Sequence, residues 1–176
     1  AKINDDIYVS GNLGDSYLGL LVLKNKIKLN SRLKKYFTNQ YFMPNIQLKL
    51  IDQIKKFANT SIDISDGLLA DLDKMINNQK LSYKLFLKDI PITNNLKKLL
   101  DLKKLSKINF ISNGDDYQVL FTASKNKMRI IKKIASNCRV KLTKIGSIQS
   151  YLKKSCIIDG KNRQISLKNK GYFHKF

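Results

Sequence analysis

The stretch of sequence that decides the fold is TSIDISDGLLADLD, residues 60–73. In its first half, polar residues alternate with Ile62 and Ile64, which is the period of a half-buried strand. Beyond Asp66 the apolar residues recur at helical spacing instead, as Leu68, Leu69, Leu72, Met75 and Ile76. The stretch therefore predicts a strand, a tight turn and a helix that begins near Asp66.

The polar residues of this stretch suit a hard cation. We expect Asp63 and Ser65 on one strand face and Asp66 at the helix start, so two carboxylates and a hydroxyl fall within four residues. Mg²⁺ prefers such oxygen ligands and pairs with substrate phosphates, and the free N–H groups of a helix start attract an anion. The alternative is structural: Asp66 caps the helix and Asp63 is a solvated edge residue. The spacing alone does not choose between them.

A second group of acidic residues lies in SNGDDYQVLF, residues 112–121. All 13 acidic residues of the chain are aspartates, and six of them fall in these two short stretches. Asp115 and Asp116 form a Gly-Asp-Asp turn that leads into an alternating strand. Two adjacent carboxylates at a strand start can hold a cation or a cationic ligand.

The chain is strongly basic, with 34 lysines and arginines and a net charge of +21. Only four of the 34 are arginines, and the lysines are spread over all the predicted helices. Base recognition favours the arginine fork, and base stacking needs clustered exposed aromatic side chains. We therefore expect nonspecific polyanion binding at low salt and no specific nucleic-acid partner.

The remaining patterns predict one compact domain in the 176 residues, of which 43% are hydrophobic. Further strands are expected at 6–10, 83–87, 139–148 and, as a hairpin, 155–158 with 164–167, and helices at 15–24, 31–37, 46–58, 94–106 and 124–137. Strands and helices follow each other without strict βα alternation. The expected fold class is therefore α/β, or layered α+β, with a mixed sheet packed with helices.

No apolar run reaches transmembrane length, so we expect no membrane partner. Cys138 and Cys156 lack metal-ligand spacing, which makes a reducing cytoplasm the default expectation.

Four motifs occur in order along the chain: VSGNLG (9–14), DISDGL (63–68), GDDY (114–117) and GYFH (171–174). Together they resemble the C-terminal half of thiamine-monophosphate kinase, over nearly the whole chain. The wider superfamily includes aminoimidazole ribonucleotide synthetase, selenophosphate synthetase and a hydrogenase maturation protein. GDDY and GYFH favour the thiamine enzyme over these relatives, and the resemblance implies the C-terminal-domain fold of the superfamily.

The resemblance implies ATP-dependent, Mg²⁺-dependent phosphorylation of thiamine phosphate to thiamine diphosphate by direct in-line transfer. By matching position, Asp63 and Asp66 would bind Mg²⁺, Ser65 would contact ATP, Asp115 would contact thiamine phosphate, and Tyr172 would lie against its ring system. No catalytic nucleophile is implied, because phosphoryl transfer depends on positioning and charge neutralisation.

The chain also departs from the family pattern, since Asp115 and Gln118 stand where glutamates are usual. The resemblance implies that residues 1–10 are the end of a linker or strand from an N-terminal ATP-binding domain and that 11–176 form the C-terminal substrate- and metal-contributing domain. It also implies a homodimer for the complete enzyme, and we expect the chain alone to be inactive. The alternatives are a non-catalytic binding domain on the same fold, or half of a related ATP-dependent synthetase or maturation protein.

Overall fold

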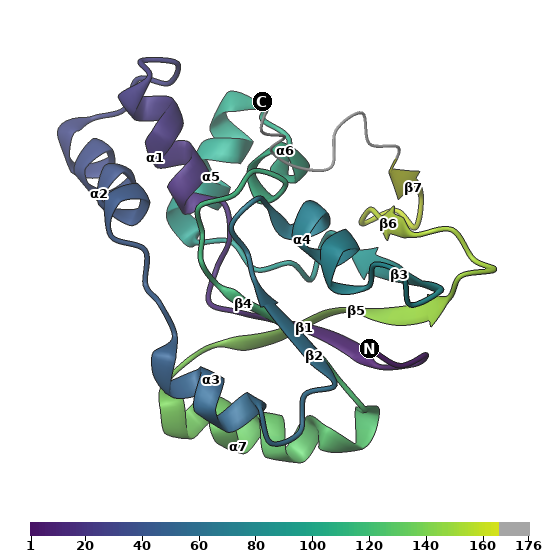
Figure 1. Ribbon diagram of the computed structural model, residues 1–176. Coiled ribbons are helices and arrows are strands. Elements are labelled where there is room, and N and C mark those ends of the chain that lie inside the picture. Colours follow the sequence, from purple (N-terminus) through teal and green to yellow (C-terminus); the bar gives the residue numbers. More distant parts are fainter. Residues whose placement is uncertain (166–176) are drawn as a thin grey trace.

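A computed structural model describes residues 1–165, which form a mixed seven-stranded sheet with helices on both faces and at one end (Figure 1). The strands are β1 (Asp6–Ser10), β2 (Thr60–Asp63), β3 (Leu81–Phe86), β4 (Val119–Ala123), β5 (Leu142–Ser150), β6 (Cys156–Ile158) and β7 (Gln164–Ile165). The helices are α1 (Asp15–Leu23), α2 (Ser31–Phe42), α3 (Leu48–Ile54), α4 (Leu68–Met75), α5 (Asn94–Lys103), α6 (Lys107–Ile111) and α7 (Met128–Cys138), with a 3-10 turn at Lys125–Lys127.

The strand order is β2-β4-β1-β5-β3-β6-β7, and every neighbouring pair is antiparallel except β3 and β6. The expected fold class, a mixed sheet packed with helices, is confirmed. β1 lies in the middle of this sheet, between β4 and β5. That a further domain precedes it stays a prediction.

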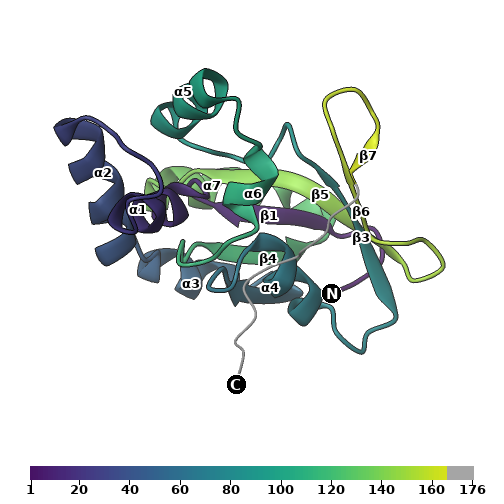
Figure 2. The same ribbon diagram turned by 90° about the horizontal axis from the view of Figure 1, so that it is seen from above.

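Alternation along β1 divides the core into layers. Ile7 and Val9 lie in one apolar cluster with most of the buried apolar residues of α4 and α6. Tyr8 faces the opposite side, where it stacks on Phe121 of β4 with ring centroids 5.3 Å apart, and this cluster is covered by α3 and α7. A third cluster joins α1, α2 and α5. These helices lie at one end of the sheet, as Figures 1 and 2 show.

The element bounds differ from the sequence-based expectation mainly at helix ends. The helix expected at 94–106 ends at Lys103, because Lys104 takes a left-handed conformation (φ 50°) and ends α5, and α6 follows it as a helix that was not expected. The strand expected from residue 117 begins only at Val119. Among residues 1–165, no helix combines the length and the apolar character that a membrane crossing requires.

Candidate functional site

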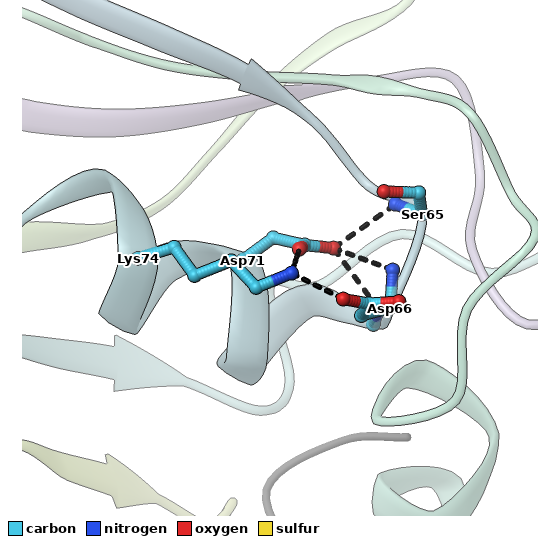
Figure 3. Close-up of polar contacts among 5 residues, drawn as sticks. Ser65, Asp66, Asp71 and Lys74 are labelled. Atoms are coloured by element: carbon cyan, nitrogen blue, oxygen red, sulfur yellow. Dashed lines mark hydrogen bonds and ion pairs between the residues drawn. The ribbon is translucent and has the colours of Figure 1, made fainter. Parts of the chain in front are cut away.

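The turn between β2 and α4 is organised by a buried aspartate inside the helix. The Oδ2 atom of Asp71 accepts the backbone N–H groups of Ser65 and Asp66 at 2.9 Å and of Gly67 at 3.1 Å (Figure 3). Gly67, with φ 117°, occupies the N-cap position, and no side chain caps the helix there. The structural alternative in which Asp66 caps α4 is therefore wrong. Asp71 takes the N–H groups of the turn that precedes α4 and not those of the first helical turn, so an anion at the helix start stays a prediction.

The carboxylate of Asp66 is therefore not used to cap the helix, and Asp66 lines a cavity instead. One of its oxygens, Oδ2, accepts a hydrogen bond from the ammonium group of Lys74, which also bonds to Oδ1 of Asp71 at 3.0 Å (Figure 3). These two hydrogen bonds raise the pKa of Lys74 above its usual value. Lys74 therefore balances the charge of Asp66 while leaving its Oδ1 without a partner in the described part of the chain.

The two aspartate-rich stretches are joined backbone to backbone. The N–H of Asp115 donates to the carbonyl of Ser65 at 2.9 Å, and the N–H of Tyr117 donates to the carbonyl of Ile64 at the same distance. Gly114 makes this approach possible, because a Cβ atom there would lie 1.7 Å from the Ser65 carbonyl oxygen. Two segments that are 50 residues apart in the sequence therefore form one site.

Three of the predicted site residues line one cavity of about 670 Å³, namely Ser65, Asp66 and Asp115. Its other walls include Tyr17, Tyr41 and Tyr117 and the lysines Lys24 and Lys26. Burial raises the pKa of Asp115, and the negative charge of Asp66 raises it further. The cavity therefore combines carboxylates, aromatic faces and cationic groups, a lining suited to a ligand with a cationic ring and an anionic group.

Two other predicted residues are not part of this lining. Asp63 is exposed at the end of β2 and does not line the cavity. Tyr172 and the GYFH motif lie outside the described residues.

The two carboxylates of the Gly-Asp-Asp turn lie in different surroundings. Asp116 is buried, and its Oδ2 accepts the N–H of Gly14 at 2.8 Å, at the start of α1. Burial raises its pKa well above the usual range. Asp115 lines the large cavity, whereas Asp116 lines a separate polar cavity of about 130 Å³. The prediction from sequence that these two adjacent carboxylates could hold one ligand together is therefore wrong, because they line different cavities.

Sequence reasoning missed the buried network around this smaller cavity. Asp15 accepts hydrogen bonds from the Tyr36 hydroxyl at 2.9 Å and the Thr93 hydroxyl at 2.8 Å. Burial raises the pKa of Asp15 to about 6, although both hydrogen bonds oppose the shift. Tyr36 and Thr93 lie 21 and 78 residues away in the chain, so no local spacing could have indicated the network.

The residues present fit a magnesium site that has only one or two protein ligands. Within residues 1–165, no group of three or more histidine, cysteine or acidic side chains is arranged to hold a metal. Mg²⁺ is commonly held by one or two carboxylates, with water and substrate phosphates supplying its other ligands. Asp66, with its unpartnered Oδ1, fits this role, and Asp63 is an exposed carboxylate at the neighbouring strand end.

The chain resembles known proteins in both sequence and structure, although no protein-family profile matches it. Thiamine-monophosphate kinase of Buchnera aphidicola subsp. Acyrthosiphon pisum (strain APS) is 34% identical over 177 residues, covering 99% of this chain and 54% of that protein. AaThiL, solved in complex with AMPPCP and TMP, matches with a TM-score of 0.77 and 25% identity over 98% of this chain and 52% of its own. Escherichia coli HypE matches with a TM-score of 0.73 at 14% identity, over 99% of this chain and 52% of its own, which shows a shared fold alone.

The chain therefore has the C-terminal-domain fold that thiamine-monophosphate kinase and HypE have in common. In sequence it is a homologue of the C-terminal part of thiamine-monophosphate kinase. It spans about half the length of the curated relatives it matches.

Proposed function

We propose that this chain supplies the substrate- and metal-contributing part of a thiamine-phosphate kinase, which transfers the γ-phosphoryl group of ATP to thiamine phosphate. The single observation that carries the proposal is the cavity that gathers Ser65, Asp66 and Asp115 beside three tyrosines. The homology to thiamine-monophosphate kinases supports the same reaction. An N-terminal ATP-binding domain and a homodimer of the complete enzyme are parts of this proposal.

Each residue has a role that its surroundings allow. Asp66, with Asp63, would hold Mg²⁺, which supplies charge neutralisation for the transferred phosphoryl group. Ser65 would contact ATP from the turn that Asp71 holds in place. Asp115, in the cavity wall, would attract the cationic thiazolium ring, and the aromatic faces beside it would pack on that ring. Tyr172 is proposed to contact the same ring system.

Calorimetric titration of thiamine phosphate into the purified chain, with Mg²⁺ present, tests the substrate site. We expect saturable binding that weakens at least tenfold in Asp115→Asn. The control is Asp52→Asn, which removes the same charge at an exposed position of α3 that lines neither this cavity nor the cavity beside α5. Absence of binding by the unaltered chain, or equal losses in both variants, would overturn the assignment.

The metal site is tested separately. In Asp66→Asn, the Mg²⁺-dependent part of nucleotide binding should disappear, while thiamine phosphate binding without Mg²⁺ should persist. Unchanged Mg²⁺ dependence would remove Asp66 from the proposed ligand set.

A further inference from the structure

A second large cavity, of about 460 Å³, lies between the β3–α5 connection, α5 and the beginning of α6. It shares no lining residue with the candidate site. Figure 2 shows α5 standing out from the sheet, with α6 leading back toward it. A volume of this size is in the usual range for small-molecule sites.

The cavity has an apolar floor and a positively charged rim. Ile90, Pro91 and Leu100 are buried apolar residues in its wall. The charged residues around it are four lysines and two aspartates, a formal excess of two positive charges (4 − 2): Lys88, Lys97, Lys107, Lys141, Asp89 and Asp101.

Lys107 is the fixed member of the rim. Its ammonium group is half-buried and donates hydrogen bonds to the backbone carbonyls of Leu87 at 2.7 Å and Ile90 at 2.5 Å. These contacts hold the charge in the cavity wall rather than out in solvent. A lysine held in this way is a preorganised point charge, which saves part of the entropy of ordering it when a ligand binds.

The neighbouring lysines leave this positive charge incompletely balanced. Burial lowers the pKa of Lys107 to about 8; the carboxylate of Asp89 opposes the shift, and the like charges of Lys97 and Lys141 add to it. Neither Lys97 nor Lys141 forms a side-chain hydrogen bond or an ion pair within residues 1–165. An anion in the cavity would relieve this mutual repulsion.

We propose that the cavity lined by Lys97, Lys107 and Lys141 binds a small phosphorylated molecule, with its phosphate on the lysines and its uncharged body on the apolar floor. Lysine ammonium groups bind phosphate as point charges. The apolar floor adds area that inorganic phosphate cannot use, so a ligand with both parts binds more tightly than either part alone. This site is additional to the proposed kinase site.

Titration of the ¹⁵N-labelled chain with adenosine monophosphate, adenosine and inorganic phosphate, followed by NMR, tests the proposal. We expect saturable shifts at the amides of residues 97, 105, 107 and 141, with adenosine monophosphate binding at least tenfold more tightly than the other two probes. Shifts confined to residues 65, 66 and 115 would place the ligand in the kinase site and overturn the proposal. Absence of saturable binding would overturn it as well.

A pair of charge-matched double variants separates a specific site from general electrostatics. Lys97→Ala with Lys141→Ala should weaken adenosine monophosphate binding at least tenfold. Lys132→Ala with Lys133→Ala, on the exposed side of α7, removes the same charge and should change it less than twofold. Equal losses in the two variants would mean nonspecific attraction to a chain of net charge +21 and would contradict the site.

Discussion

The carboxylate of Asp71 accepts the backbone N–H of Asp66 at 2.9 Å, so the aspartate that lines the cavity is positioned by another that is completely buried. The same oxygen holds Ser65 and Gly67. Three backbone donors of the turn thus depend on one side chain. Asp71 is a positioning residue, and it accounts for the shape of the turn without touching the cavity itself.

Replacement of Asp71 by alanine should therefore be severe. It leaves three N–H groups of a partly buried turn without their acceptor, and unsatisfied buried donors cost about 1–3 kcal/mol each. We expect a loss of at least about 3 kcal/mol in the free energy of unfolding, measured by urea denaturation. Asp52→Ala is the control, because Asp52 also pairs with a lysine three residues later but is exposed. If the urea midpoint of Asp71→Ala differed from that of the unaltered chain by no more than the midpoint of Asp52→Ala does, Asp71 would not be holding the turn.

The approach of the two loops at Gly114 makes a second prediction. A Cβ atom at Gly114 would lie 1.7 Å from the Ser65 carbonyl oxygen, whereas at Gly160 it would meet nothing within 4 Å. Gly114→Ala should destabilise the chain by about 1–3 kcal/mol, as overpacking of a tight contact does, and should weaken thiamine phosphate binding by displacing Asp115. Gly160→Ala should leave both quantities unchanged. The measurements are urea denaturation and calorimetry, and equal behaviour of the two variants would show that the loops are free to separate.

The buried Asp15 predicts a pH dependence of stability. Burial raises its pKa in the folded chain to about 6, above the value near 4 expected in the unfolded chain. The unfolded state therefore loses this proton first, so the stability contributed by the protonated group is complete below pH 4 and is lost as pH rises through 6. The predicted loss is about 3 kcal/mol, and Asp116, whose pKa burial also raises, acts in the same direction.

Asp15→Asn removes this titration. Urea denaturation at pH 4, 5, 6 and 7 should show a smaller fall in unfolding free energy for the variant than for the unaltered chain. Asp101→Asn, at an exposed position, should retain the full fall. Identical slopes for Asp15→Asn and the unaltered chain would show that Asp15 titrates normally in the fold.

The parts of the fold that could be predicted from sequence are those set by local periodicity. The change from period two to helical spacing predicted β2 and α4, because each side of the change depends only on neighbouring residues. The hairpin of β6 and β7 across Asp159 and Gly160 was likewise predictable, and the pairing of Ile158 with Gln164 confirms it over the described residues.

The parts that could not be predicted depend on contacts between distant segments. Asp115 and Asp116 are adjacent in sequence, but they line different cavities because they have different hydrogen-bond partners. The N–H of Asp115 donates to the carbonyl of Ser65, whereas the carboxylate of Asp116 accepts the N–H of Gly14, 102 residues away. That Asp71, and not Asp66, accepts the N–H groups of the turn could not be predicted either. Both are aspartates near the same helix start, and the choice between them depends on which one is buried.

The buried contacts of Gln118 require an amide, because its three side-chain hydrogen bonds need both an acceptor and a donor. Its Oε1 accepts from the Ser10 hydroxyl at 2.8 Å, and its Nε2 donates to the Asn45 carbonyl at 3.1 Å and to the Asp116 carbonyl at 3.5 Å. In Gln118→Glu a buried carboxylate would face the Asn45 carbonyl, and we expect a loss of about 1–3 kcal/mol in unfolding free energy at pH 7. The loss should shrink at pH 4, where the protonated carboxyl can donate to that carbonyl again. The control is Gln149→Glu in β5, which introduces the same charge at a residue without a side-chain hydrogen bond in the described structure. It should show neither effect. If Gln118→Glu had the same unfolding free energy as this control at both pH values, the contact would not be selective for an amide.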